Sequence, residues 1–302
     1  MATNATSTRA TSPHLATSEI LFNSILVATD FSKPAHQALK VAMTIGHAFH
    51  ARLLLLHATV PLVFDVESGP IPEDVLTANL ESDKKEMQQL IAKEAGLSDL
   101  QPTEIVSFGE VVDLVNTACH DHKVDLVVIG SHGASGFERL ALGSIAESVL
   151  HRSSCPAMIV GPNCALVEHP FRSILFATDL TSTGLRAAQY AASLAERFHS
   201  RLTLLHVAHP GKVDAATAAA EKAHREIEQL LPDDISQYCK TEIRIAAGKP
   251  ADEILATSNS IAASLIVVGL KDRPLADHAT WSTLSHVIRE AKCPVLGVRS
   301  HL

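Results

Sequence analysis

Glycines gather in one short stretch of the chain, between an apolar run and a segment of helical character. Residues 130–144 read GSHGASGFERLALGS after the apolar residues 125–129, with glycines at Gly130, Gly133, Gly136 and Gly143. Glycine allows the backbone to come close to a phosphate, and free N–H groups at a helix start favour an anion. The order of strand, glycine loop and helix start therefore predicts a phosphate cradle. Glycines alone are equally typical of a flexible loop, and that alternative stays open.

Polar residues follow the apolar runs that we expect to end at the same edge of a sheet. Asp30 could accept a hydrogen bond from an adenine amino group or a ribose hydroxyl, or it could cap the helix that follows. His57 is expected to bind a backbone carbonyl rather than to catalyse. His132 lies within the glycine loop and is the better candidate for a ligand contact. Arg139 is basic and close to the loop, although a solvated side chain explains it equally well.

The composition of the 302-residue chain excludes several classes of protein. Hydrophobic residues make up 46% and aromatic residues 4%, which predicts a globular protein with an aliphatic core. A net charge of −8, without a run of lysine or arginine, argues against nucleic acid as a partner. No apolar stretch approaches the ~20 residues needed to span a bilayer, so we expect no membrane partner.

The cysteines and histidines follow no spacing that is typical of a metal site or a disulfide framework. The five cysteines include no CxxC pair, and an odd number suits a reducing compartment, so we expect a cytoplasmic location. The seventeen histidines contain no HExxH motif. Residues 1–19 are rich in Ala, Ser and Thr and lack a hydrophobic segment, which predicts a disordered tail rather than a transit peptide.

The chain contains an internal repeat. The matching segments are 24–30 with 173–179, 51–57 with 200–206, 125–130 with 264–269, and 155–156 with 293–294. The first half carries about ten extra residues between its second and third apolar runs. A repeat of this size predicts two copies of one domain.

Short aliphatic runs alternate with longer helical stretches in each half. In the first half the pattern predicts strands at 24–29, 52–58, 103–107, 125–130 and 156–160, and helices at 33–49, 73–95, 110–122 and 142–152. Runs that are apolar on both faces belong in a parallel sheet covered by helices. The alternation therefore predicts a doubly wound α/β sheet in each half. We expect a tail at 1–19, a first domain at 20–162, a linker at 163–170 and a second domain at 171–302.

These motifs together resemble the ATP-binding type of universal stress protein. The resemblance rests on Gly130-x2-Gly133-x9-Gly143-Ser144, on Ala28-Thr29-Asp30 and on Cys155-Pro156, and it covers nearly everything from residue 20 onward. It implies a five-stranded parallel sheet of order 3-2-1-4-5 that holds ATP with Mg²⁺ or Mn²⁺. The residues implied to line adenine and ribose are Ala28, Thr29, Asp30 and Ala58. Those implied to line ribose and phosphates are Ile129, Gly130, His132, Gly133, Gly143, Ser144 and Ile145.

The second half departs from the glycine pattern. Trp281 stands where Gly143 stands in the first half, and Asp272 replaces Gly133. A carboxylate about 4 Å from a phosphate charge costs roughly 4 kcal/mol at an effective dielectric near 20, and we expect the indole to fill the space for phosphate. The second half is therefore predicted not to bind ATP in this manner, although Lys271 and Arg273 leave room for another anion.

Pairing of the halves is the role expected for the second one. The last strands, 157–160 and 294–298, would lie at open sheet edges, which proteins usually cover, and the resemblance implies association through that strand. The two halves could then pair within one chain, with a homodimer as a further alternative. The leading hypothesis is an ATP-binding stress-response protein that signals to an unknown protein partner.

Two other functions stay open at this stage. One is an enzyme that hydrolyses ATP slowly or transfers a phosphoryl or nucleotidyl group, although the chain has no GxxxxGK[ST] motif and only His132 offers a general base in the loop. The other is a scaffold that binds no ATP. Because no catalytic residue stands out, an enzyme is the less favoured of the alternatives.

Overall fold

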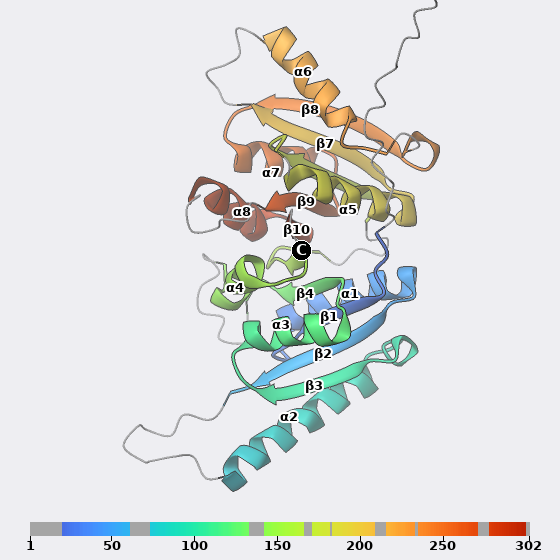
Figure 1. The fold of residues 1–302 in the computed structure, drawn as a ribbon. Helices are drawn as coiled ribbons and strands as arrows, with labels where there is room; N and C mark the ends of the chain where they lie inside the picture. The colour runs from blue at the N-terminus through green and yellow to red at the C-terminus, as the bar shows by residue number, and fades with distance from the viewer. Residues whose placement is uncertain are drawn as a thin grey trace, which may run out of the picture.

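The computed structural model describes residues 20–60, 73–132, 142–165, 171–181, 183–208, 216–232, 235–270 and 278–299. Residues 1–19, expected to form a tail, and residues 166–170 of the expected linker lie outside the described residues. Figure 1 shows the strands of both halves side by side, with helices on either side of them.

The first half alternates strands and helices as its sequence predicts. Its elements are β1 (Ser24–Ala28), α1 (Lys33–Phe49), β2 (Arg52–Thr59), α2 (Glu73–Lys93), the 3-10 turn η2 (Ser98–Leu100), β3 (Thr103–Phe108), α3 (Val111–His122), β4 (Leu126–Gly130), α4 (Ser144–Arg152) and β5 (Ala157–Val160). The predicted bounds agree to within two residues. Helix α4 begins at Ser144 rather than at residue 142 because its N-cap, Gly143, has an extended backbone with ψ of 141°.

The second half repeats this order. Its elements are β6 (Ser173–Thr178), α5 (Thr183–Phe198), β7 (Arg201–Ala208), α6 (Ala216–Glu228), the 3-10 turn η4 (Ile235–Gln237), β8 (Lys240–Ala247), α7 (Pro250–Ser260), β9 (Leu265–Leu270), α8 (His278–Glu290) and β10 (Val295–Arg299). The repeat seen in the sequence is therefore a repeat of the whole strand–helix order.

All ten strands belong to one sheet. Their order is β3-β2-β1-β4-β5-β10-β9-β6-β7-β8, so each half has the order 3-2-1-4-5 and is parallel within itself. Strands β5 and β10 pair antiparallel, with Leu296 opposite Met158, and this pairing joins the halves (Figure 1). The edges that β5 and β10 would otherwise expose are thus paired with one another.

Helices cover both faces of the sheet. Side chains of α1 and α5 belong to one hydrophobic cluster, and those of α3, α4, α7 and α8 belong to the other. The clusters are mainly aliphatic, as the low aromatic content predicts. A doubly wound arrangement of this kind brings the carboxyl ends of neighbouring strands to a common edge, where α/β proteins place their ligand sites.

Candidate functional site

The candidate site lies at the carboxyl ends of β1, β2 and β4. Strand β1 is flanked by β2 and β4, so the chain turns in opposite directions on the two sides of it. Such a switch point leaves a crevice between the connections. Ala28 at the end of β1 lies opposite Ile129 near the end of β4, which brings two of the residues implied by the resemblance side by side.

The turn that leaves β1 is held by its own side chains. Asp30 accepts two hydrogen bonds through Oδ1, one from the Ser32 backbone N–H at 3.1 Å and one from the Ser32 hydroxyl at 2.5 Å. Ser32 is the N-cap of α1 and accepts from the Ala35 N–H. Asp30 therefore supports the capping residue rather than capping the helix itself.

Thr29, in the same turn, has a buried side chain. Its N–H donates to the Leu56 carbonyl at 2.8 Å, and its hydroxyl oxygen accepts from the Phe31 N–H at 3.0 Å. Phe31 has a φ of +62°, a left-handed conformation that L-residues seldom adopt. The side-chain hydrogen bonds of Thr29 and Asp30 hold the chain in this tight turn, which directs it from the sheet edge into α1.

His57 anchors the same turn from β2. Its Nδ1 lies 2.8 Å from the Thr29 carbonyl oxygen, to which it donates, and its ring stacks on Phe31 with 4.5 Å between centroids. Its Nε2 lies 3.4 Å from Asp83 of α2. The expected backbone hydrogen bond of this histidine is confirmed, and its ring nitrogens are both engaged by protein groups.

Small side chains meet on the α3 and α4 side of the strand ends. Side chains alternate along a strand, and Ala28 and Ile129 belong to the cluster on this face. Ala58 is two residues beyond Leu56 of the same cluster, so it lies on the same face. The two alanines are buried, at 5% and 9% exposure. Neither alanine extends a side chain beyond Cβ at the strand ends.

Gly130 permits close packing between β4 and α1. A Cβ atom at this position would lie 3.0 Å from the Pro34 carbonyl carbon and 3.1 Å from its oxygen. Those are backbone atoms at the first turn of α1, so a side chain at residue 130 would push the helix away from the strand. Gly130 thus fixes the position of the α1 start at the edge of the site.

A direct hydrogen bond joins the end of β4 to the start of α4. The Gly143 N–H donates to the Ser131 carbonyl at 2.9 Å, and a Cβ at residue 143 would lie 2.7 Å from that oxygen. Ser131 is 1% exposed and donates its own N–H to Val160 of β5. Ser131 belongs to no sequence motif of its own, and its place in the glycine loop is the one signal that points to it. Because of this junction, the first turn of α4 begins directly beside β4.

The remaining predicted contacts surround that junction. His132 places Nδ1 2.9 Å from the Ser131 hydroxyl, and Ile145 in the first turn of α4 is 45% exposed, which is unusual for an isoleucine. Ser144 is the first residue of α4. The structure therefore gathers the described residues predicted to line the site, while Gly133, Gly136 and Arg139 lie outside the described residues.

The second half repeats the turn but not the junction. Asp179 Oδ1 accepts from the Thr181 N–H and hydroxyl, and His206 Nδ1 lies 3.0 Å from the Thr178 carbonyl. Helix α8 begins at His278, about one turn before the position that corresponds to Ser144. Trp281 therefore lies inside a helix, where Gly143 is an N-cap. Lys271, Asp272 and Arg273 lie outside the described residues.

The Trp281 indole makes a contact between the halves. Its ring lies 3.9 Å, between centroids, from the ring of His151 on α4. The expectation that the indole fills a phosphate space concerns a loop, residues 271–277, that lies outside the described residues. The extra turn of α8 is the feature that separates this helix start from that of α4.

An arginine side chain of the second half also contacts the C-terminal end of helix α4. The Arg299 guanidinium donates to the Leu150 carbonyl at 2.7 Å and to the His151 carbonyl. Burial lowers the pKa of His151 below its ordinary value; Arg299 adds to that decrease and Glu147 opposes it. Neither Arg299 nor His151 was expected to matter from the sequence. Both hold the end of the helix whose first turn borders the site.

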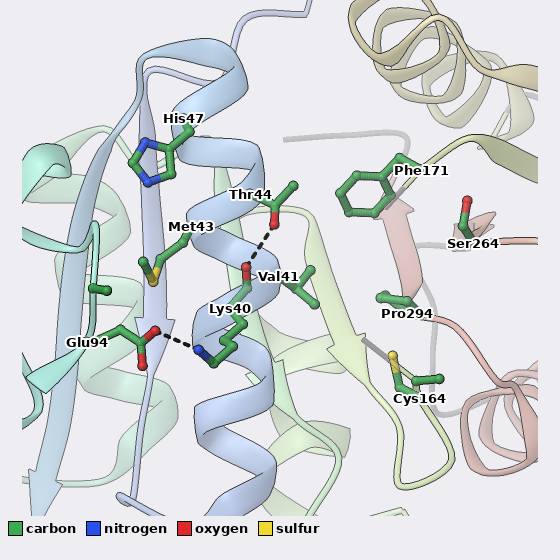
Figure 2. Close-up of a pocket in the computed structure, with 12 residues that line it drawn as sticks. Lys40, Val41, Met43, Thr44, His47, Glu94, Cys164, Phe171, Ser264 and Pro294 are labelled. Carbon is green, nitrogen blue, oxygen red and sulfur yellow. Dashed lines mark hydrogen bonds and ion pairs between the residues drawn. The ribbon is translucent and has the colours of Figure 1, made fainter. Parts of the chain in front are cut away.

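A separate hollow of about 350 Å³ lies between α1 and the beginnings of β6, β9 and β10. Figure 2 shows Phe171, Pro294 and Cys164 across from Val41 and Thr44 of α1. The ammonium group of Lys40 lies 2.7 Å from Glu94, and that ion pair forms part of the polar lining (Figure 2). The described strand-end residues of the candidate site do not line this hollow.

The chain belongs to the universal stress protein family. The sequence profile of that family matches residues 21–161 and 170–299, one domain in each half. The chain is also similar to individual members. A Bacillus subtilis universal stress protein is 31% identical over 46% of this chain and 99% of its own length, and one from Mycolicibacterium smegmatis is 24% identical over 91% and 96%.

A solved structure has the same fold along almost the whole chain. A universal stress protein from Archaeoglobus fulgidus superposes with a TM-score of 0.69 at 20% identity, covering 93% of this chain and 97% of that one. At that identity the similarity shows the fold alone. Within the described residues, no helix is long and apolar enough to cross a membrane, and no three His, Cys, Asp or Glu side chains gather as a metal site.

Proposed function

We propose that the first half binds ATP at the ends of β1, β2 and β4, and that the protein acts as a binding and signalling module in a stress response. The observation that carries this proposal is the junction between Ser131 and Gly143, because it sets the first turn of α4 beside the end of β4. A helix start next to a glycine-rich strand end supplies backbone N–H donors and a favourable dipole for phosphate.

Each side of the crevice has a separate task in this proposal. Ala28 and Ala58 leave space for adenine, while Thr29 and Asp30 border the ribose. The phosphates lie along Ile129, Gly130, His132 and the first turn of α4, with Ser144 and Ile145, and Gly133 completes the set. Hydrogen bonds to a charged acceptor contribute about 1.5–3 kcal/mol each, so three or four of them approach the ~8 kcal/mol of micromolar binding.

A divalent cation, Mg²⁺ or Mn²⁺, accompanies the nucleotide in this proposal. Phosphate oxygens are hard ligands that suit either ion. Since the described residues contain no cluster of three metal-ligating side chains, we assign no protein ligand to the cation. Its contribution would be to neutralise charge on the triphosphate that α4 and the loop bind.

The second half has a different role in the proposal. Its α8 starts one turn earlier than α4, so the backbone of an extra helical turn lies where the first half leaves the N-cap glycine. We therefore assign no ATP site to it. Its role is to pair with the first half through β5 and β10 and to hold the end of α4 through Arg299.

The proposal is tested by identifying the small molecules that the native protein carries. Mass spectrometry of the heat-released fraction should detect about one adenine nucleotide per chain, and added ATP should exchange into the same site. Gly133→Asp and Gly143→Ala should each lose it, while Asp179→Asn in the second half should retain it.

Three results would contradict the proposal. One is retention of the nucleotide by both glycine variants, and another is its loss in Asp179→Asn. The third is a wild-type chain that releases no nucleotide and shows no response in an ATP titration. Rapid ADP formation with excess ATP and Mg²⁺ would instead favour the enzyme hypothesis, because a binding module requires no turnover.

A further inference from the structure

Two cysteines of the first half, which belong to different parts of the chain, lie close to one another. Cys119 lies in the last turn of α3, and Cys155 lies between α4 and β5. The segment before Cys155 is fixed to α3 by Asn116, whose Oδ1 accepts from the Ser154 N–H at 3.0 Å and whose Nδ2 donates to the Arg152 carbonyl at 3.1 Å. Asn116 is three residues before Cys119, so both lie on the same side of the helix.

The backbone of Val124 links the two cysteines at the end of α3. The Cys155 thiol donates to the Val124 carbonyl at 3.0 Å, and the Val124 N–H donates to the Cys119 carbonyl at 3.1 Å. The largest influence on the pKa of each thiol is the side chain of the other, which places the two thiols next to one another. Both are free thiols, and Cys119 is buried while Cys155 is half-buried.

The surroundings make the two thiols chemically unequal. The side chain of Cys119 lowers the pKa of Cys155, with Ser154 and the Arg186 guanidinium of α5 adding to that decrease, while burial and Asp125 oppose it. The side chain of Cys155 and burial raise the pKa of Cys119. A half-buried thiol of lowered pKa beside a buried one is the arrangement of an attacking cysteine and a resolving cysteine.

The second half contains the same arrangement with one sulfur removed. Cys293 corresponds to Cys155, and Ser258, whose hydroxyl influences the pKa of Cys293, stands where α3 has Cys119. Burial raises the pKa of Cys293 to about 12, and the hydroxyl of Ser258 opposes that increase. Two copies of one scaffold thus place the same two positions in contact. Only the first copy has two sulfur atoms there.

We propose that Cys119 and Cys155 are a redox-sensitive dithiol that closes into a disulfide when the protein meets a hydroperoxide. The Cys155 thiolate attacks one peroxide oxygen and forms a sulfenic acid, and the O–O bond breaks to release water or an alcohol after protonation. The Cys119 sulfur then attacks the sulfenic sulfur, loses its proton and displaces water. Two thiols are oxidised by two electrons and one peroxide is reduced.

The disulfide would close a ring of chain around the candidate site. Residues 119–155 include β4, the described loop positions Gly130 and Gly143, and all of α4. A cross-link constrains the unfolded chain and so stabilises the segment it encloses. Oxidation should therefore raise the melting temperature of the full-length protein.

The test is peroxide oxidation of the reduced, full-length chain at a small molar excess. Thiols counted under denaturing conditions should fall from five to three. Peptide mapping should give one cross-linked pair that contains Cys119 and Cys155, lighter by two hydrogens, and dithiothreitol should restore both thiols. Cys164, Cys239 and Cys293 should stay free, because burial raises the pKa of each to about 11 or 12.

The matched control is Cys119→Ser, which copies the Ser258 and Cys293 pair of the second half and is therefore compatible with the fold. It should give no intramolecular cross-link and no rise in melting temperature, and Cys155→Ser should behave in the same way. The proposal is overturned if the wild-type thiols disappear evenly. It is also overturned if Cys155 reaches the sulfinic acid while Cys119 stays free, or if the cross-links join separate chains.

Discussion

The two halves of the protein share the turn after their first strand and differ at the helix before their last strand. Asp30 and Asp179 accept the same pair of hydrogen bonds, from Ser32 and Thr181 respectively. The residue that follows each aspartate, Phe31 in the first half and Leu180 in the second, has a φ of +62° and +61°, respectively. Since the second half keeps these hydrogen bonds while its α8 lacks a glycine N-cap, the hydrogen bonds within the turn serve the fold in both halves.

The two halves differ most at the start of α4 and at its counterpart in α8, next to the candidate site of the first half. Gly143 adjoins Ser131 so closely that no side chain fits, whereas Trp281 at the matching position is part of a helix and contacts His151 of the other half. The same contrast applies to Arg299, whose counterpart in the first half is Gly161. Comparison of the two copies thus separates two kinds of contact. The hydrogen bonds that recur hold the fold of each half, and the features that do not recur belong either to the candidate ligand site or to the contact between the halves.

The largest effect is expected for Gly143→Ala. Its Cβ would lie 2.7 Å from the Ser131 carbonyl oxygen, so β4 and α4 must separate at the cost of about 1–3 kcal/mol. Nucleotide retention should fall by more than about tenfold, which corresponds to about 1.4 kcal/mol. Nucleotide content and urea unfolding measure the two effects. Gly46→Ala in α1 is the control, because the nearest atoms to its Cβ would be the side-chain methyls of Leu100 at 3.2 and 3.3 Å, with the Ala51 carbonyl at an ordinary 3.6 Å. Equal nucleotide loss in both variants would contradict the account.

Arg299→Ala should destabilise the joined halves. Its guanidinium donates to carbonyls at the end of α4, and hydrogen bonds to a charged group contribute about 1.5–3 kcal/mol. We expect a loss of about 2 kcal/mol in the free energy of unfolding. Arg244→Ala removes an exposed ion pair with Glu242 and should cost less than about 1 kcal/mol. If Arg299→Ala lowers the free energy of unfolding by less than Arg244→Ala does, the contact between α4 and β10 contributes little to stability.

Asp30→Asn and Asp179→Asn form a matched pair that separates folding from binding. An asparagine keeps the Oδ1 acceptor of the turn, so both variants should lose less than about 1 kcal/mol of stability, and by similar amounts. Only Asp30→Asn should weaken ATP binding, by about tenfold or 1.4 kcal/mol. Calorimetric titration with ATP measures the difference. Equal affinities in the two variants would assign Asp30 to the turn alone.

The smallest effect is expected from the pH dependence of the contact between the halves. Burial lowers the pKa of His151 below the ordinary value near 6.5, so the unfolded chain binds this proton more readily than the folded one. The contribution of His151 to stability is then present above about pH 6.5 and is lost as the pH falls. His151→Gln should make the fall in stability between about pH 7 and 5 less steep. Trp281 is the single tryptophan, so its fluorescence reports the unfolding; an unchanged slope would contradict this assignment.

Local patterns predicted most of the fold and much of the candidate site. Apolar runs and helical periodicity gave the strands and helices to within two residues in the first half, because those signals depend on neighbours along the chain. Ser32, the N-cap of α1, stands before Lys33 and Pro34, an order that is typical of a helix start. Glycine spacing directed attention to the junction that Gly143 forms with Ser131, although the role of the Ser131 carbonyl had no sequence signature.

Contacts between distant parts of the chain could not be derived in the same way. Counting along the repeat placed Trp281 opposite Gly143, but it could not show that α8 starts a turn earlier or that the indole contacts His151. The partnership of Cys119 with Cys155 was equally hidden. Each of these depends on how two elements pack, and side chains that are far apart in sequence leave no periodic trace of their contact.

Hydrophobic periodicity and glycine placement act locally, so the order of residues alone establishes a duplicated α/β chain with a glycine-rich loop in one copy. The way the copies meet emerges only in three dimensions, where β5 pairs with β10 and Arg299 contacts the end of α4. Strand edges and helix ends carry unpaired backbone groups, and these groups find their partners only when the halves dock.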